Sequence, residues 1–301
     1  MTTNQKFTKK FSNSITHNIK LSNYSWFNLG GPAEYLFKPK NKEELIEFLK
    51  ENKKDNYKVT IIGAGSNTLI RDNGVKGVVI KLGLGFSGIK LIKDDVIEAG
   101  SALLDRKLSD FAKNNGISNF EFLSCIPGSI GGAVIMNSGC YGYDISKVLI
   151  SLKVIDINIA QEREIKREDL EFYYRGTSLP ENLIITSVKL RGRVDSKDKI
   201  EKLQNELIKK KKLSQPSQIK TCGSTFKNKI PGKQAWQLIK EAGCDKFKEG
   251  DAIISQKHSN FFVNNGKAKS ADIERLIYRV KEAVSKKIGI DLELEIKIIG
   301  E

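Results

Sequence analysis

The stretch with the most unusual composition runs from residue 126 to residue 139 and reads IPGSIGGAVIMNSG. Its four glycines and one proline disfavour both a helix interior and a central strand, yet it is apolar and uncharged, unlike a linker. Bare backbone lets a polar ligand approach closely, and successive N–H groups of glycine-rich turns bind anions such as phosphate. The alternative is a tight chain crossing between packed elements.

A second glycine loop, GAGSNT at residues 63–68, follows a β-branched run. It lacks the Gly-Lys-Ser/Thr ending of a P-loop, and Thr68 stands where the third glycine of a dinucleotide fingerprint belongs. Alone it is explained equally well by a β-turn. Two such loops in one chain suit the pyrophosphate of a dinucleotide held by a small and a larger domain.

Charge and composition narrow the class of protein. The chain has 301 residues, 39% hydrophobic and 29% charged, as in globular proteins, and neither a run of 18 apolar residues nor a secretory signal is found. We therefore expect a cytoplasmic protein without membrane insertion. The net charge of +15 raises nucleic-acid binding, but the lysines alternate with acids and lack interleaved aromatics, so an anionic nucleotide substrate is preferred.

Metal binding is not expected. The histidines and cysteines are widely scattered, without a Cys-x-x-Cys pair, which argues against zinc and against disulfides: His17, His258, Cys125, Cys140, Cys222 and Cys244.

The pattern of elements predicts an α+β protein in three parts. Residues 1–85 read as a small α/β unit, with a helix over 41–56 capped by Asn41 and strands at 59–62 and 77–82. Residues 86–195 read as a larger, mostly antiparallel sheet with long strands at 148–159 and 182–191. They include a helix over 102–115 with Leu104 on its apolar face and Gly116 as its C′ residue.

Residues 196–301 form the third part of this prediction. Helices are expected at 195–213, 232–242 and 270–288, and strands at 260–263 and 292–299. No internal repeat stands out.

Several motifs occur together in one order. They are GAGSNTL (63–69), IPGSIGGA (126–133), NSGCYG (137–142), Tyr174-Arg175, GSTFKN (223–228) and ELEIKIIG (293–300). With this set, the chain resembles the UDP-N-acetylenolpyruvoylglucosamine reductases, from about residue 24 to residue 300. That family makes UDP-N-acetylmuramate for peptidoglycan, and so serves cell-wall biogenesis, cell shape and cell division.

The resemblance implies a two-part FAD-binding domain of the vanillyl-alcohol-oxidase type and a C-terminal α+β domain that binds a UDP-sugar. NADPH is the implied reductant, and hydride passes from the flavin to the enolpyruvyl vinyl carbon. The residues implied to meet the FAD pyrophosphate are Gly63, Gly65, Ser66, Asn67, Pro127, Gly128, Ser129, Gly131 and Gly132.

Three catalytic residues follow from the resemblance and suit the chemistry. Arg175 would hold the substrate carboxylate with its planar fork. Ser224 would give a proton to the carbon beside the hydride acceptor, and Glu295 would stabilise the developing enol together with Arg175. Taken alone, each has an ordinary structural alternative: an exposed arginine, a turn serine, and a solvated strand face shared with Glu293.

Two departures from the family pattern concern the expected substrate contacts. The chain has Thr177 where the family has serine, and Pro231 is displaced within the loop after Phe226. The short segment between Arg175 and Ser224 indicates the branch that lacks an extra tyrosine-bearing loop. The expected substrate-binding residues are then Tyr174, Lys227, Asn228, Gln256 and His258, the last weighed equally as part of a turn before a strand.

Two other functions stay open at this point. One is a different FAD oxidoreductase of the same fold, although neither glycine loop holds a histidine for covalent flavin attachment. The other is a basic nucleic-acid-binding protein, supported only by the net charge. The expectation is a monomeric flavin reductase without a nucleic-acid partner.

Overall fold

The computed structural model describes residues 10–301, which divide into two compact units. The first comprises residues 10–17, Tyr35–Ala64 and Gly77–Lys210, and the second comprises Asn18–Glu34, Gly65–Lys76 and Lys211–Glu301. The unit boundary therefore falls inside the first glycine loop, between Ala64 and Gly65. The division into residues 1–85, 86–195 and 196–301 stays a prediction.

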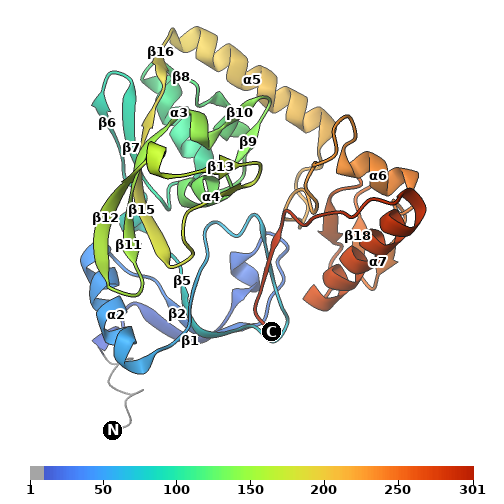
Figure 1. Ribbon diagram of the computed structural model, residues 1–301, viewed down its shortest axis with the longest axis horizontal. Helices are drawn as coiled ribbons and strands as arrows, with labels where there is room; N and C mark the ends of the chain where they lie inside the picture. The colour runs from blue at the N-terminus through green and yellow to red at the C-terminus, as the bar shows by residue number, and fades with distance from the viewer. Residues whose placement is uncertain (1–9) are drawn as a thin grey trace. The chain divides into compact units, whose positions relative to one another are not determined.

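The first unit is built on a five-stranded antiparallel sheet in the order β12-β11-β15-β7-β6 (Figure 1). Its strands are β6 (Ile89–Lys93), β7 (Val96–Gly100), β11 (Leu149–Asp156), β12 (Gln161–Lys166) and β15 (Leu183–Arg191). Alternating Val, Ile and Leu residues of β11 and β15 fill its core. The predicted larger antiparallel sheet is confirmed.

A four-stranded sheet in the order β1-β2-β5-β3 accompanies helix α2 (Lys42–Asp55). Its strands are β1 (Ile15–Lys20), β2 (Pro32–Phe37), β3 (Val59–Ile61) and β5 (Val75–Ile80), and β3 pairs with β5 in parallel. The Asn41 side chain accepts a hydrogen bond from the Glu44 N–H, and Asn56 is left-handed with φ 53°. The predicted cap is confirmed, and the helix has the predicted place.

Two expectations about the first unit are wrong. Residues 130–135 form a short helix, α4 (Ile130–Ile135), despite their glycines, because Ile130, Ala133 and Val134 are buried and Gly131 sits against Ser101, where a Cβ would come within 3.0 Å. Helix α3 (Asp105–Asn114) starts later than predicted, so Leu104 precedes it and is 50% exposed. Gly116 does have the positive φ (67°) predicted for a C′ glycine.

Short elements complete the first unit. They are η2 (Leu84–Phe86), β8 (Ile117–Ser118), η3 (Glu121–Cys125), β9 (Gly139–Cys140), β10 (Tyr143–Asp144), η4 (Ile145–Lys147), η5 (Arg167–Asp169), β13 (Phe172–Tyr173), β14 (Gly176–Thr177) and β16 (Arg193–Val194). Helix α5 (Lys197–Ser214) continues into the second unit.

The second unit combines early segments of the chain with its C-terminal third. Its elements are η1 (Leu21–Tyr24), β4 (Thr68–Ile70), α6 (Ala235–Glu241), β17 (Lys248–Glu249), β18 (Ala252–Ile254), β19 (Phe262–Asn264), α7 (Ser270–Ile288) and β20 (Lys297–Ile299). Strands β17, β18 and β19 form an antiparallel sheet, and β20 pairs in parallel with β4. Phe27, Leu29 and Leu69 belong to the same core as α6 and α7.

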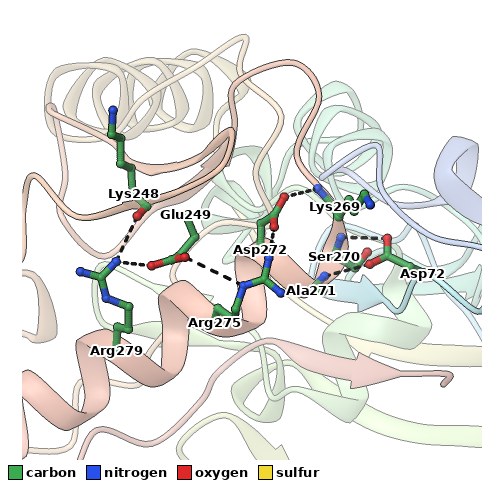
Figure 2. A network of polar contacts seen from close by, with 9 residues as sticks. All are labelled: Asp72, Lys248, Glu249, Lys269, Ser270, Ala271, Asp272, Arg275 and Arg279. Carbon is green, nitrogen blue, oxygen red and sulfur yellow. Dashed lines mark hydrogen bonds and ion pairs between the residues drawn. The ribbon is translucent and has the colours of Figure 1, made fainter.

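The N-terminus of α7 is held by the segment that follows β4 (Figure 2). The Asp72 carboxylate accepts hydrogen bonds from the Ser270 N–H (2.9 Å) and the Ala271 N–H (3.0 Å). The neighbouring Arg71 makes a bidentate pair with Glu274. The carboxylate thus satisfies two amides that a helix start leaves without partners. Residues 65–76, which include half of the first glycine loop, are fixed to α7 in this way.

Candidate active site

The first glycine loop presents a row of backbone donors. Among residues 10–301, no protein acceptor meets the amides of residues 63–67. Gly65 has φ 72°, and a Cβ there would lie 1.8 Å from the Tyr24 carbonyl oxygen. Glycine is therefore required at position 65 by the fold itself, whereas the open row of amides is suited to an anion.

The second glycine loop, at residues 127–132, offers donors within the first unit. The Ile130 and Gly131 amides are used internally, by the Leu103 and Ser101 carbonyls at 2.9 and 2.8 Å. In the described part of the chain, the amides of Gly128, Ser129 and Gly132 meet no protein acceptor, and Pro127 is exposed. Half of the loop thus folds back on the protein and half is open for a ligand.

The two loops meet in the first unit. A Cβ built on Gly63 would lie 3.0 Å from the Ser129 hydroxyl oxygen, so the backbone of one loop directly adjoins the side chain of the other. The predicted pairing of the two loops therefore has a geometric basis, at Gly63 and Ser129.

Lys81 lies beside these loops, although none of the sequence motifs includes it. Its Nζ donates a 2.6 Å hydrogen bond to the Gly63 carbonyl oxygen, and burial lowers the pKa of its ammonium group, with a smaller contribution from Lys38. The position could have been found, because β3 and β5 are parallel and the residues after their carboxyl ends share one edge of the sheet.

Ser224 and Glu295 are brought together in the second unit, on adjoining backbone segments. The Glu295 N–H donates to the Thr225 carbonyl oxygen (2.9 Å), and the Asn67 amide donates to the Glu295 carbonyl oxygen (3.0 Å). Lys297 N–H in turn donates to the Asn67 carbonyl oxygen (2.9 Å). A residue of the first glycine loop thus lies against the backbone that carries two of the three predicted catalytic side chains.

Glu293 and Glu295 have different surroundings, although strand alternation predicts one shared face. Residues 292–296 are not a regular strand, and only Lys297–Ile299 forms β20, so the expected strand over 292–299 is wrong in its first half. Glu293 is exposed and paired with Lys227 and Lys229, whose hydrogen bonds lower the pKa of its carboxyl group. Glu295 is half-buried. The solvated alternative describes Glu293 better than Glu295.

Arg175 lies in the first unit, in the tight turn between β13 and β14. Its φ of 61° is left-handed, a conformation that costs an arginine backbone strain, and its guanidinium lies 4.9 Å from the Tyr174 ring centre. The buried Asn137 side chain donates to the Tyr173 carbonyl oxygen (3.2 Å) and so braces the turn. Strain held by surrounding structure is typical of functional residues.

The four remaining predicted substrate residues lie in the second unit in different settings. Lys227, with Lys229, Lys233 and Glu293, lines a cavity of about 150 Å³. Asn228 accepts a hydrogen bond from the Ala235 N–H (2.8 Å) at the start of α6, and Gln256 is exposed and donates to Asp245 (3.4 Å).

His258 lies within a turn before β19, and its ring meets Phe261 edge-on at 4.8 Å. Its buried Nδ1 has no partner among the described residues, and burial lowers the pKa of the imidazole, which favours its neutral form. In the described part of the second unit, the buried side-chain atoms without partners are this nitrogen and the Thr225 hydroxyl. Such atoms are rare in folded proteins. In the sequence, Thr225 directly follows Ser224, and His258 lies three residues before Phe261.

Among residues 10–301, no cluster of three or more His, Cys, Asp or Glu side chains suits a metal ion, and none of the four cysteines forms a disulfide. No helix in that range is long and apolar enough to cross a membrane.

Comparison with known proteins bears directly on these two sets of residues. A family model described as FAD binding domain matches residues 33–158, which contain both glycine loops. A second, described as UDP-N-acetylenolpyruvoylglucosamine reductase, C-terminal domain, matches residues 215–299, which contain Ser224 and Glu295. The protein named UDP-N-acetylenolpyruvoylglucosamine reductase in Pelagibacter ubique (strain HTCC1062) is 48% identical over 98% of each chain.

The chain belongs to the UDP-N-acetylenolpyruvoylglucosamine reductase family. A reductase of this name from Gluconobacter oxydans (strain 621H) is 42% identical, over 95% of this chain and 92% of the relative. The crystal structure of a UDP-N-acetylenolpyruvylglucosamine reductase from Thermus caldophilus matches with a TM-score of 0.82 at 32% identity, covering 94% of this chain and 98% of that one. The predicted family is confirmed, as is a mixed α+β fold with an FAD-binding domain.

The residues present fit the FAD that this reductase family's domain implies. Within the first unit, the open amides of Gly63, Ala64, Gly128, Ser129 and Gly132 supply hydrogen-bond donors for a pyrophosphate, and Lys81 supplies a cation beside them.

Proposed function

We propose that this protein is the FAD-dependent enzyme that reduces UDP-N-acetylglucosamine enolpyruvate to UDP-N-acetylmuramate with NADPH, in peptidoglycan precursor synthesis. The observation that supports it most is the assembly of Ser224, Glu295 and Asn67: a proton donor and an acid beside a residue of the FAD loop. When bound, FAD would take a hydride from NADPH and deliver it to the vinyl carbon of the substrate.

The protein's own residues supply binding, charge and a proton in this proposal. The two glycine loops bind the FAD pyrophosphate, with Lys81 beside them. Amides and side chains of Gly63, Gly65, Ser66, Asn67, Gly128, Ser129 and Gly132 donate to it. Pro127, which has no N–H, and Gly131, whose N–H donates to the Ser101 carbonyl oxygen, shape the second loop. Arg175 holds the substrate carboxylate with two parallel hydrogen bonds. Because hydride addition develops negative charge on that carboxylate, a fixed guanidinium stabilises the transition state more than the substrate.

Ser224 gives its hydroxyl proton to the carbon next to the one that receives the hydride. A serine hydroxyl is a weak acid, so this transfer requires a strongly basic enolate carbon. Glu295, in its protonated form, donates to the enolate oxygen and assists Arg175. Tyr174, Lys227, Asn228, Gln256 and His258 bind the UDP-sugar, and Lys227 is aided by its neighbours Lys229 and Lys233.

We also propose that the enzyme acts as a cytoplasmic monomer with no nucleic-acid partner and belongs to the branch without the extra tyrosine-bearing loop. Between Arg175 and Ser224 the chain forms β14, β15, β16 and α5, which supports this assignment. The net charge of +15 then attracts the anionic UDP-sugar and NADPH.

A direct test is the colour and chemistry of the purified protein. Flavin absorbance at about 450 nm, bleached by NADPH and restored without oxygen by the enolpyruvyl sugar nucleotide, is the expected result. A colourless protein that cannot be loaded with FAD would contradict the proposal.

A further inference from the structure

The segment that carries Ser224 is held on both sides by other backbone in the second unit. On one side, the Thr225 N–H donates to the Asn260 carbonyl oxygen (2.8 Å) and Ser224 pairs with Phe261. On the other, the Lys227 N–H donates to the Glu293 carbonyl oxygen (2.8 Å) and Phe226 pairs with Leu294. The position of Ser224 relative to Glu295 is therefore set by hydrogen bonds along residues 225–227, which include the bond from the Glu295 N–H to the Thr225 carbonyl oxygen.

The Asn260 side chain adds two further hydrogen bonds to this segment. Its Oδ1 accepts from the Phe226 N–H (2.9 Å) and its Nδ2 donates to the Phe226 carbonyl oxygen (2.8 Å). The residue is 1% exposed, so neither bond can be replaced by water. The side-chain amide thus makes the two hydrogen bonds that a neighbouring strand would make, next to the point where the backbone pairing of Ser224 with Phe261 ends.

Few side chains other than asparagine could make both of these bonds to Phe226. A carboxamide both accepts and donates in one plane, which matches the N–H and C=O of a single residue. A carboxylate only accepts, and an alanine does neither. The sequence gives no hint of this, because a buried asparagine before a strand is read as a turn residue.

We propose that Asn260 is a positioning residue for proton delivery, which fixes the backbone of Phe226 and through it the Ser224 hydroxyl against Glu295. This inference rests on the proposed function. It extends the site to a residue that touches neither cofactor nor substrate, and it predicts that loss of Asn260 impairs only the step in which the substrate is protonated.

The test measures the two half-reactions separately, by stopped flow without oxygen, in Asn260→Ala and wild type at equal flavin occupancy. The rate of flavin reduction by NADPH should equal that of the wild type. The dissociation constant of FAD should also be unchanged. Reoxidation by the enolpyruvyl sugar nucleotide should slow by about 10- to 100-fold, the order expected for a displacement of the reacting group near 1 Å. The solvent deuterium isotope effect on reoxidation should rise, because proton transfer becomes slower.

The matched control is Asn264→Ala. Asn264 is also buried (4% exposed), and its side chain also bonds to backbone, donating to Phe27 and accepting from Gly266 and Ala268. The Asn264 side chain supports segments that are remote in sequence from Ser224. Asn264→Ala should therefore lose about as much thermal stability as Asn260→Ala, while both half-reactions and the isotope effect stay near those of the wild type.

Asn260→Asp keeps the shape of the side chain and serves if the alanine variant does not fold. Its carboxylate can accept from the Phe226 N–H and cannot donate to the carbonyl, so reoxidation should again slow selectively. Equal slowing of both half-reactions, or no slowing in either variant, would overturn the inference. Wild-type enzyme that the sugar nucleotide does not reoxidise would instead refute the proposed function.

Discussion

At the scale of single residues, Ser224 is the most direct test of the chemistry. Ser224→Ala should leave flavin reduction by NADPH intact and abolish product formation, because only the second half-reaction needs the hydroxyl proton. Both rates are read from flavin absorbance in single-turnover mixing. Ser87→Ala, at a half-buried serine of the first unit whose hydroxyl donates to the Leu84 carbonyl oxygen, is the control. Equal loss of both half-reactions would contradict the assignment.

Glu295 and Glu293 form a natural pair for comparison. Glu295→Gln should slow flavin reoxidation at saturating substrate, since the amide stabilises a developing negative charge less well than an acid. Glu293→Gln should change KM instead, because it frees Lys227 and Lys229 from their ion pairs. An unchanged reoxidation rate in Glu295→Gln would return Glu295 to the solvated-strand interpretation.

Asp105 predicts a pH dependence of stability. It is 1% exposed, neither carboxyl oxygen has a partner among the described residues, and burial raises its pKa well above 3.8. Below pH 3.8 the carboxyl is protonated in both the folded and the unfolded state, so its ionisation does not change the free energy of unfolding. Above it, the unfolded state alone ionises, so stability falls by about 1.4 kcal/mol per pH unit until the folded-state pKa is reached.

Asp105→Asn removes this ionisation with little change of shape. The variant should lose less stability than the wild type as pH rises from 4 towards 7, measured as the free energy of unfolding in urea at several pH values. Identical slopes in the two proteins would show that the carboxyl is paired or ionised in the folded state.

At the scale of elements, the segment after β4 links the first glycine loop to α7 (Figure 2). Asp72→Ala removes the carboxylate that accepts from the Ser270 and Ala271 amides, which should cost about 1 kcal/mol of stability. It should also weaken FAD binding, because residues 65–67 lose their anchor. Asp198→Ala, also in the first turn of a helix and exposed, should change neither quantity. Thermal unfolding and flavin titration of the apoprotein measure both.

Elements with strong local patterns could be predicted, and those decided by distant contacts could not. The Asn41 cap, the Gly116 end and the long strands β11 and β15 are encoded in adjacent residues. Helix α4 forms in the glycine stretch because buried Ile130 and Val134 outweigh glycine's poor propensity. The irregular backbone at 292–296 reflects pairing with residues 225–227, which no local periodicity reports.

Only part of the candidate site could be predicted from local sequence patterns. The glycine loops stand out by composition, and Arg175, Ser224 and Glu295 could be assigned only through a family resemblance. Lys81, Asn137 and Asn260 were missed because each is an ordinary polar residue whose role depends on a backbone group far away in the sequence.

At the scale of the whole molecule, the chain folds into units that are not contiguous in sequence. Residues 18–34 and 65–76 belong with the C-terminal third, through β4–β20 pairing and a shared core. A division of the sequence into consecutive parts, such as the predicted boundary at residue 85, places these two segments together with the rest of residues 1–85. Parallel pairing of β4 with β20, more than 200 residues apart, leaves no local signature.

The net charge of +15 makes a prediction for the whole molecule. If the positive field attracts the anionic substrates, kcat/KM should fall as NaCl rises from low concentration to about 0.15 M, where the screening length is about 8 Å. KM should carry most of the change. Values independent of salt would show that the charge has no part in substrate capture.

The central claim is tested most directly by single-turnover oxidation of the reduced protein. FAD-loaded protein is reduced with one equivalent of NADPH without oxygen and mixed with UDP-N-acetylglucosamine enolpyruvate. We predict that flavin absorbance at about 450 nm returns in step with one equivalent of UDP-N-acetylmuramate. Flavin that stays reduced, or that reoxidises while the sugar nucleotide is recovered unchanged, would contradict the account.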